Sequence, residues 1–219
     1  MLRLLFEKKG NAVWISHLDL MRLFQRAFKR AGMPLTHTQG FNPRPSVSIA
    51  LPLSVGVESN CELLDFELDG IQLPYDEICS RLNATLIEGI NVLKVYPCEK
   101  KIREIAFLHC NLTLEYDANI SQSAVSKIQE LFQREELLVL KKSKNGIKDE
   151  NVIPMIRSLS VSRADANTLV LHTRICCQNP TLNPAQLTAA IRKYLPELEP
   201  DFSRCCREEV YNTEDKIFR

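Results

Sequence analysis

The segment Trp14–Asp19 contains the residue best suited to proton transfer, His17. An imidazole gains and loses its proton near neutral pH. His17 comes just before an amphipathic pattern, so it would lie at a helix N-terminus, where backbone amides favour anions. There it could act as a general acid or base on a phosphate backbone. Alternatively, Ser16-x-x-Asp19 is a capping box that only begins the helix, with Asp where Glu or Gln is commoner.

A cationic strip follows on the same predicted helix. Its members recur at i, i+4, i+7 and i+8, and they are Arg22, Arg26, Lys29 and Arg30. The apolar residues fall on the opposite side, at Leu20, Phe24, Ala27, Phe28 and Ala31. Gly32 and Pro34 are typical of a helix end. The strip suits phosphate groups or an acidic partner. An ordinary solvated face is the alternative, although such faces usually mix both signs of charge.

The segment Gln39–Pro45 predicts a stiff loop, because Asn42-Pro43 favours a turn and two prolines restrict the backbone. Such a loop would present Phe41, Asn42 and Arg44 to RNA, with the ring stacking on a base. Alternatively, Phe41 fills the core and the loop is only a connection. His37, just upstream, could meet His17 if the chain returned alongside the helix, which would give a second candidate for acid–base catalysis.

Other chemistry has little support in the sequence. It contains no P-loop, G-x-G-x-x-G, G-x-S-x-G or H-E-x-x-H motif. The eight cysteines are scattered or directly adjacent, which is typical of reduced thiols rather than a disulfide framework. Zinc binding would need the adjacent pairs 176–177 and 205–206, whose neighbouring side chains point apart on a strand. We therefore expect no metal site. His109 and His172 fall on the more polar face of alternating strands, where both could be half-exposed and inert.

Charge is distributed unevenly along a chain whose net charge is only +1. Residues 1–50 carry eight basic and two acidic residues, whereas residues 51–97 carry two basic and eight acidic ones. A basic patch can therefore exist without a basic overall composition. Asp65 and Glu67 share one face of a predicted strand, and we expect this face to be wet and acidic. No apolar run is long enough for a membrane helix or a signal peptide, so we expect a cytoplasmic protein with no membrane partner.

Alternation and periodicity predict an α+β fold made of two similar halves. The expected strands are 2–7, 46–54, 62–68, 91–96, 105–116, 137–140 and 168–177. The expected helices begin near Ser16, Pro74, Ser121 and Asn183. Each half is interpreted as strand–helix–strand–strand–helix–strand, the ferredoxin-like order, with helices on one face of an antiparallel sheet. The boundary is expected between 1–98 and 99–219.

Several of these motifs together resemble the radical-SAM-linked domain of unknown function. The resemblance rests on Ser16–Arg22, Gly40–Pro45 and Leu51–Ser59, and it is dense over roughly residues 1–70. It implies an accessory module that stands alone or is fused behind a radical-SAM enzyme. At position 44 this chain has Arg where many members have His, so no metal or proton-transfer role is carried over to it.

Three functions are compatible with this pattern. In the first, the chain binds RNA or another polyanion as an accessory to a radical-SAM protein in RNA modification. This chain has no C-x3-C-x2-C motif, so the iron–sulfur cluster and SAM would belong to the partner, and we expect no cofactor on this chain. In the second, it is an RNA-processing enzyme that uses His17 as a general acid–base. In the third, it only binds proteins. The sequence does not decide whether the chain is an enzyme.

Overall fold

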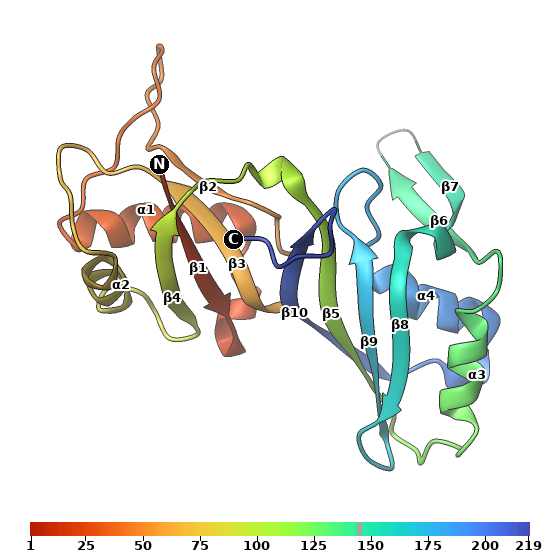
Figure 1. Ribbon diagram of the computed structural model, residues 1–219. Coiled ribbons are helices and arrows are strands. Elements are labelled where there is room, and N and C mark those ends of the chain that lie inside the picture. Colours follow the sequence, from red (N-terminus) through yellow and green to blue (C-terminus); the bar gives the residue numbers. More distant parts are fainter. Residues whose placement is uncertain (144–145) are drawn as a thin grey trace. The chain divides into compact units, whose positions relative to one another are not determined.

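Four α-helices and mainly antiparallel strands make up the part of the chain that the computed structural model describes, residues 1–143 and 146–219. The predicted α+β class is confirmed. The chain divides into two compact units, Met1–Ile102 with Arg219, and Arg103–Phe218 (Figure 1). Lys144 and Asn145, in the middle of a polar turn predicted from the sequence, lie outside the described residues.

The first unit alternates strands and helices. In chain order it contains β1 (Leu2–Lys8), α1 (His17–Arg30), β2 (Val47–Ile49), β3 (Glu58–Phe66), α2 (Tyr75–Asn83) and β4 (Ile90–Pro97). The strands pair in the order β4-β1-β3-β2, and each pairing is antiparallel. One hydrophobic core holds residues from both helices and from all four strands. The strand predicted over 46–54 is much shorter, because only 47–49 pair with β3.

Both ends of α1 are fixed by local hydrogen bonds. The Ser16 hydroxyl accepts from the Asp19 amide at 3.2 Å and donates to the Asp19 carboxylate at 2.7 Å. Ser16 is therefore the N-cap, as predicted. At the other end Gly32 takes a φ of +69°, and the Met33 amide donates to the Phe28 carbonyl at 2.9 Å. This is a Schellman turn, in which glycine tolerates the left-handed backbone.

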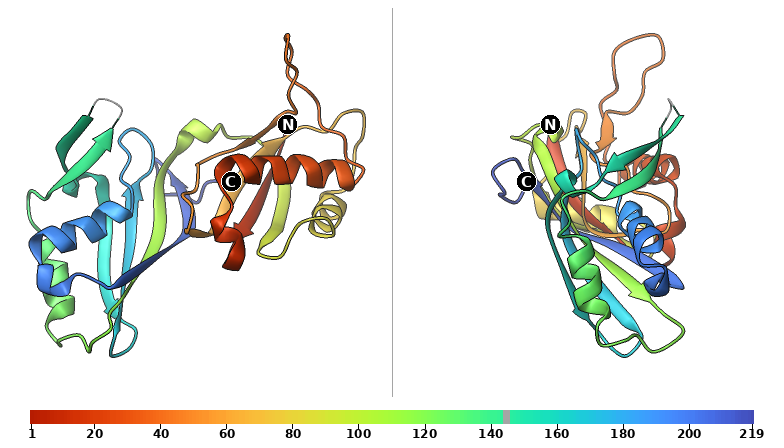
Figure 2. Two further views of the ribbon diagram at one scale, coloured as in Figure 1. Left: turned by 180° about the vertical axis from the view of Figure 1, so that it is seen from behind. Right: turned by 90° about the vertical axis from the view of Figure 1, so that its right-hand side faces the viewer.

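Aromatic pairs seat α1 on the sheet. Phe24 meets Phe6 of β1 edge-on with ring centroids 4.8 Å apart, and Phe28 meets Phe66 of β3 at the same separation. All four rings are buried. Burial of each such side chain contributes about 1.5–3 kcal/mol to stability. Because Phe24 and Phe28 lie one turn apart, the two contacts fix the rotation of α1 about its axis. Figure 2 (left) shows α1 in front of these strands.

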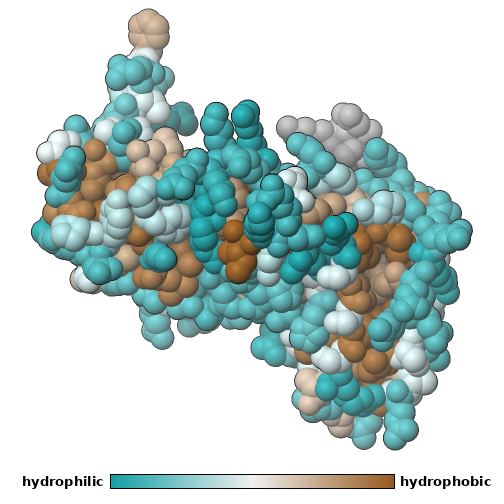
Figure 3. Space-filling view, in the orientation of Figure 1, coloured by the Kyte–Doolittle hydropathy of each residue, from teal (hydrophilic) through white to brown (hydrophobic). Residues whose placement is uncertain are grey.

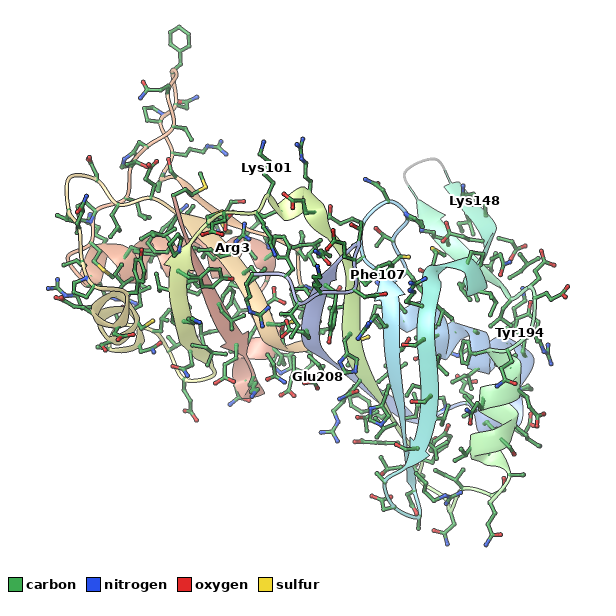
Figure 4. All side chains as sticks on the ribbon, viewed as in Figure 1. Arg3, Lys101, Phe107, Lys148, Tyr194 and Glu208 are labelled. Carbon is green, nitrogen blue, oxygen red and sulfur yellow. The ribbon has the colours of Figure 1, made fainter. Side chains whose placement is uncertain are left out.

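A buried ion pair joins β1 to β3 on the other face of the sheet. Arg3, labelled in Figure 4, is fully buried and donates to both carboxylate oxygens of Asp65, at 2.6 and 2.9 Å. Its guanidinium also donates to the Lys100 carbonyl at 2.9 Å. The expectation of a wet acidic face is therefore wrong at Asp65. The charge of Arg3, two residues from the N-terminus, stabilises a carboxylate that the local pattern places at the surface.

The strands of the second unit also pair antiparallel. In chain order it contains β5 (Ile105–Glu115), α3 (Ala124–Leu131), β6 (Leu138–Ser143), β7 (Gly146–Asn151), β8 (Ile156–Arg163), β9 (Thr168–Cys176), α4 (Ala185–Tyr194) and β10 (Phe202–Asn212). Its main strands pair in the order β10-β5-β9-β8, and β6 pairs with β7 in a separate hairpin. Across both units the described residues also form short 3-10 helices, η1 (Gly10–Trp14), η2 (Ile102–Glu104), η3 (Ile153–Met155) and η4 (Pro196–Leu198).

Two sequence expectations for this unit are wrong. The predicted strand 137–140 does form as β6, but it pairs with β7 in the hairpin instead of taking the second strand position of this half, which β8 occupies beside β9. The sequence of β8 is rich in serine and has few large apolar residues, so its alternation is weak. The cap of α3 is Ser123 rather than Ser121, because the helix begins at Ala124.

Alternation along β5 separates an apolar face from a polar one. Leu108, Cys110 and Leu112 are buried, whereas His109 and Asn111 between them are half-buried. The predicted alternation of this strand is confirmed. His172 on β9 is likewise half-buried, between the buried Leu171 and Thr173. Partial burial lowers the pKa of His109. The helix-free face of this sheet therefore carries polar, titratable side chains.

The substitution Asp65→Ala should lower the free energy of unfolding by about 3–5 kcal/mol, because it leaves the Arg3 charge buried without its carboxylate. Denaturant unfolding of the full chain measures this loss. The matched control is Glu77→Ala, which breaks the exposed pair between Glu77 and Arg81 and should cost at most about 1 kcal/mol. Equal, small losses in both variants would contradict the importance assigned to the Arg3–Asp65 pair.

Candidate nucleic-acid interface

The cationic strip of α1 faces solvent, as the helical spacing predicts. Arg22, Arg26, Lys29 and Arg30 are all exposed, whereas Leu20 and the phenylalanines on the opposite side are buried. The seating of Phe24 and Phe28 therefore decides which way these cations point. The confirmed part of the prediction is their shared exposure along one side of one helix.

Three of the four cations line a common groove. Arg22, Arg26 and Arg30 surround a surface hollow of about 380 Å³, and Lys29 does not line it. The other lining residues are Ile15, Asp19, Leu23 and Ile87. Ile87 comes from the segment between α2 and β4. We call this the arginine groove: a hollow lined by three arginines and by the aliphatic side chains of Ile15, Leu23 and Ile87.

The arginines of the groove differ in how they are held. Arg22 pairs with Asp19 at 3.1 Å, and Arg30 donates to the Thr85 carbonyl at 2.6 Å. Arg26 makes neither a hydrogen bond nor an ion pair with any residue in the described ranges. Arg30 is therefore positioned without being neutralised, and Arg26 keeps its full hydrogen-bonding capacity. A ligand with several anionic oxygens could satisfy both.

Asp19 is the only carboxylate among the described residues that line the groove. Hydrogen bonds from the Ser16 hydroxyl and from Arg22 lower the pKa of Asp19, so it stays ionised at neutral pH. It is already occupied by the cap and by one arginine. The groove consequently keeps a positive balance, and the acidic segment 51–97 contributes no carboxylate to its lining.

The predicted stiff loop forms a projecting hairpin of residues 36–46. The Thr38 amide donates to the Arg44 carbonyl at 2.8 Å, and His37 bridges to Pro45. Phe41 at its tip is 106% exposed, so it does not fill the core. Figure 3 shows this projection with a hydrophobic tip above a hydrophilic stem. Asn42 and Arg44 are also exposed.

The structure does not bring all the candidate residues to one place. The described residues that line the arginine groove include none from the 36–46 hairpin. His17 begins α1, which is about 21 Å long for its 14 residues, and His37 lies beyond its other end. The two histidines therefore do not form an acid–base pair. The groove and the hairpin are separate cationic features of the first unit.

His17 is poorly placed for catalysis. It is half-buried, and its Nδ1 atom is shielded from solvent without a hydrogen bond to any described residue. Any proton exchange with a ligand would have to use Nε2. The capping interactions of Ser16 and Asp19 account for the conspicuous motif around it.

The sequence alone does not identify Ile87 as part of the groove. Ile87 lies more than fifty residues after α1. Its segment is tied to the helix by the Thr85 hydroxyl, which donates to the Ala27 carbonyl at 3.3 Å. No local motif marks such a contact, and its only sequence signal is an isoleucine between two predicted elements.

Solved structures resemble this fold at very low sequence identity. A chain of a Cbf5-Nop10-Gar1 complex matches with a TM-score of 0.52 and 7% identity, covering 95% of this chain and 48% of that one. A chain of an H/ACA RNP bound to a substrate RNA containing 2'-deoxyuridine matches at 0.48 and 7%, covering 94% and 46%. An unknown protein from Galdieria sulphuraria matches at 0.26 and 10%, covering 94% and 96%. This chain thus spans about half the length of the first two. The first match shows a likeness of fold alone, and the other two scores are too low to support an argument.

Membership of a family is clearer than these structural likenesses. No curated protein matches the chain. No helix of the described residues is long and apolar enough to cross a membrane. Residues 1–184 match the family described as "Uncharacterized protein conserved in bacteria (DUF2344)", which includes both the arginine groove and the 36–46 hairpin. The chain belongs to this family of uncharacterized bacterial proteins.

Proposed function

We propose that this chain is an RNA-binding module whose primary contact is the arginine groove. One observation carries the proposal: Arg22, Arg26 and Arg30 line the same hollow, and Asp19 is the only carboxylate among its described lining residues. Guanidinium groups bind phosphate through several parallel N–H donors, and a row of them along one helix follows a phosphate backbone.

The aliphatic lining of the groove favours a nucleic acid over a simple anion. Ile15, Leu23 and Ile87 supply apolar surface in the same hollow as the arginines. A ribose or the face of a base can cover this surface while its phosphate reaches the arginines. An inorganic anion would use only the cations and leave the aliphatic side chains exposed to water.

The 36–46 hairpin supplies a second contact of a different kind. Its tip presents Phe41 entirely to solvent, with Arg44 on the same hairpin. An exposed aromatic ring on a soluble protein costs free energy unless it meets a partner, and single-stranded RNA offers unstacked bases. We assign Phe41 to base stacking and Asn42 and Arg44 to contacts near it.

We further propose that the halves 1–98 and 99–219, whose boundary lies a few residues before that of the two units, are each ferredoxin-like. The orders β4-β1-β3-β2 and β10-β5-β9-β8 support this, because each places the first and third strands of a βαββαβ unit side by side between the other two. The β6–β7 hairpin is then an insertion after the first helix of the second half. Helices cover one face of each sheet and leave the other available.

The proposed biological setting is RNA modification by a cytoplasmic radical-SAM protein to which this chain is an accessory. The motifs at Ser16–Arg22 and Gly40–Pro45, which resemble the radical-SAM-linked domain, support this setting. The partner would carry the iron–sulfur cluster and SAM, and this chain would hold the RNA. Its own cysteines do not have the C-x3-C-x2-C spacing of such a cluster site.

The substitution Arg26→Ala should weaken binding of a mixed-sequence single-stranded RNA by about 10- to 150-fold, because a charge-assisted contact to phosphate contributes roughly 1.5–3 kcal/mol. The slope of log affinity against log salt concentration is negative, and its magnitude should decrease by about 1. Fluorescence anisotropy over a salt series measures both quantities. Lys29→Ala is the matched control, since it removes a cation of the same helix that lies outside the groove. Equal effects of the two substitutions would exclude the groove as the site, and salt-independent binding would exclude a polyanion altogether.

The substitution Phe41→Ala should weaken the same RNA by about 1–3 kcal/mol and leave the salt slope unchanged, because stacking is not ionic. Phe41→Tyr keeps the ring and should restore the affinity. The side chain makes no core contacts, so thermal unfolding should be unaffected by either change. An affinity that is indifferent to Phe41→Ala would remove the hairpin from the interface.

Purification of the tagged full chain from a bacterial lysate should recover a protein that contains iron and a C-x3-C-x2-C motif. Mass spectrometry and an iron assay identify it. Nuclease treatment distinguishes a direct partner, which stays bound, from one tethered by RNA. Repeated recovery of RNA without any iron–sulfur protein would contradict the accessory role and still support RNA binding.

A further inference from the structure

A line of hydrogen bonds crosses the helix-free face of the second unit. The Ser162 hydroxyl lies 3.0 Å from Nε2 of His172, and Nδ1 of His172 lies 2.8 Å from Oδ1 of Asn111. The amide nitrogen of Asn111 in turn donates to the Glu208 carboxylate at 2.9 Å. Each residue comes from a different strand, β8, β9, β5 and β10. Glu208 is labelled in Figure 4.

The strand register explains why these side chains meet. Asn111 lies directly opposite His172, so their side chains project from the same face of the sheet. His172 lies opposite Ser160, and Ser162 is two residues along β8 on that same face. Glu208 lies where the pairing of β10 with β5 shifts by one residue, between Arg207 and Glu209. Cys206, two residues before Glu208, lies opposite Asn111, so the Glu208 carboxylate is within reach of the Asn111 amide.

The charge at one end of the line fixes the proton at the other. A carboxylate only accepts hydrogen bonds, so Glu208 orients the Asn111 amide with its nitrogen toward Glu208 and its oxygen toward His172. In neutral His172 the proton must then be on Nδ1. Nε2 is left as an acceptor, and the Ser162 hydroxyl must donate to it.

From this geometry we infer that Ser162 is an activated nucleophile and that the second unit can transfer acyl groups from a carboxylic ester. A hydroxyl that donates to an imidazole held by a third group is the arrangement that activates serine for covalent catalysis. His172 is the general base and Asn111 the positioning residue. The inference is independent of RNA binding.

The reaction needs only the ester and one molecule of water. Ser162 Oγ bonds to the ester carbonyl carbon while His172 Nε2 takes the hydroxyl proton. The bond from that carbon to the alcohol oxygen then breaks, and the alcohol leaves with the proton from His172. Water releases the acyl group by the same two steps. The base alone supplies roughly 10²–10⁴-fold of acceleration.

The position of Ser162 sets the kind of substrate. It is exposed on β8, which ends the strand order of this sheet, and His172 is half-buried beside it. An open sheet face cannot enclose a small molecule. It does admit an ester carried on a large molecule, whose remaining surface can lie along the strands. We therefore assign a macromolecular ester as the substrate class.

A fluorescent fluorophosphonate tests the nucleophile directly on the full chain. Its phosphorus bonds to an activated serine oxygen as fluoride leaves, so wild-type protein should be labelled, with the adduct on Ser162 by peptide mass spectrometry. Ser162→Ala should abolish labelling, and His172→Ala and His172→Gln should each slow it at least about 10²-fold. Ser160→Ala is the matched control on the same strand face and should label normally.

Thermal unfolding of each variant separates loss of reactivity from loss of fold. Nitrogen NMR of His172 should show a proton on Nδ1 in the wild type and a mixture of tautomers in Asn111→Leu, a change that a purely structural role of Asn111 would not produce. An unlabelled wild-type protein, an adduct on another residue, or labelling that is unaffected in a folded His172 variant would overturn the proposal. RNA affinity is measured separately, so either function can fail alone.

Discussion

The packing of Phe24 and Phe28 of α1 against β1 and β3 is the constraint on which the candidate interface depends. A helix whose buried side is fixed at two points one turn apart cannot rotate, so its opposite side is determined as well. Arg22, Arg26 and Arg30 are then exposed on one side of α1 and share a hollow with Ile87 of the segment between α2 and β4. The core, which carries no charge of its own, decides where the positive charges of the first unit converge.

Part of the acidic segment 51–97 is turned inward, which removes two of its eight carboxylates from the surface. Asp65 forms an ion pair with the buried Arg3, and Glu62 is also buried. The Arg3 guanidinium holds the β1 and β3 backbones in register at the same time. One ion pair thus stabilises the sheet on which α1 rests and removes a carboxylate from the surface. The arginines of α1 are therefore exposed while these two carboxylates are buried.

Local physics in the sequence predicted the elements, whereas contacts between distant segments escaped it. The Ser16 cap, the apolar stripe of α1 and the alternation of β5 each depend on residues a few positions apart, and they are confirmed. The place of Ile87 in the groove, the burial of Asp65 and the place of β8 depend on contacts between distant segments that no local pattern encodes. The same holds for His172. Alternation along its strand places it on the polar face, but its hydrogen bonds to Ser162 and Asn111 depend on the neighbouring strands β8 and β5.

The line of hydrogen bonds from Ser162 through His172 and Asn111 to Glu208 is difficult to explain as a stabilising feature. Its outer member Ser162 is exposed, and hydrogen bonds in contact with water contribute at most about 1 kcal/mol each to folding. The apolar face of the same strands, with Leu112 and Leu171 buried on it, supplies the stability instead. Four strands nonetheless each contribute one side chain to a single oriented line that ends at a carboxylate. Its order fixes the tautomer of one imidazole, which matters for proton transfer and hardly at all for folding.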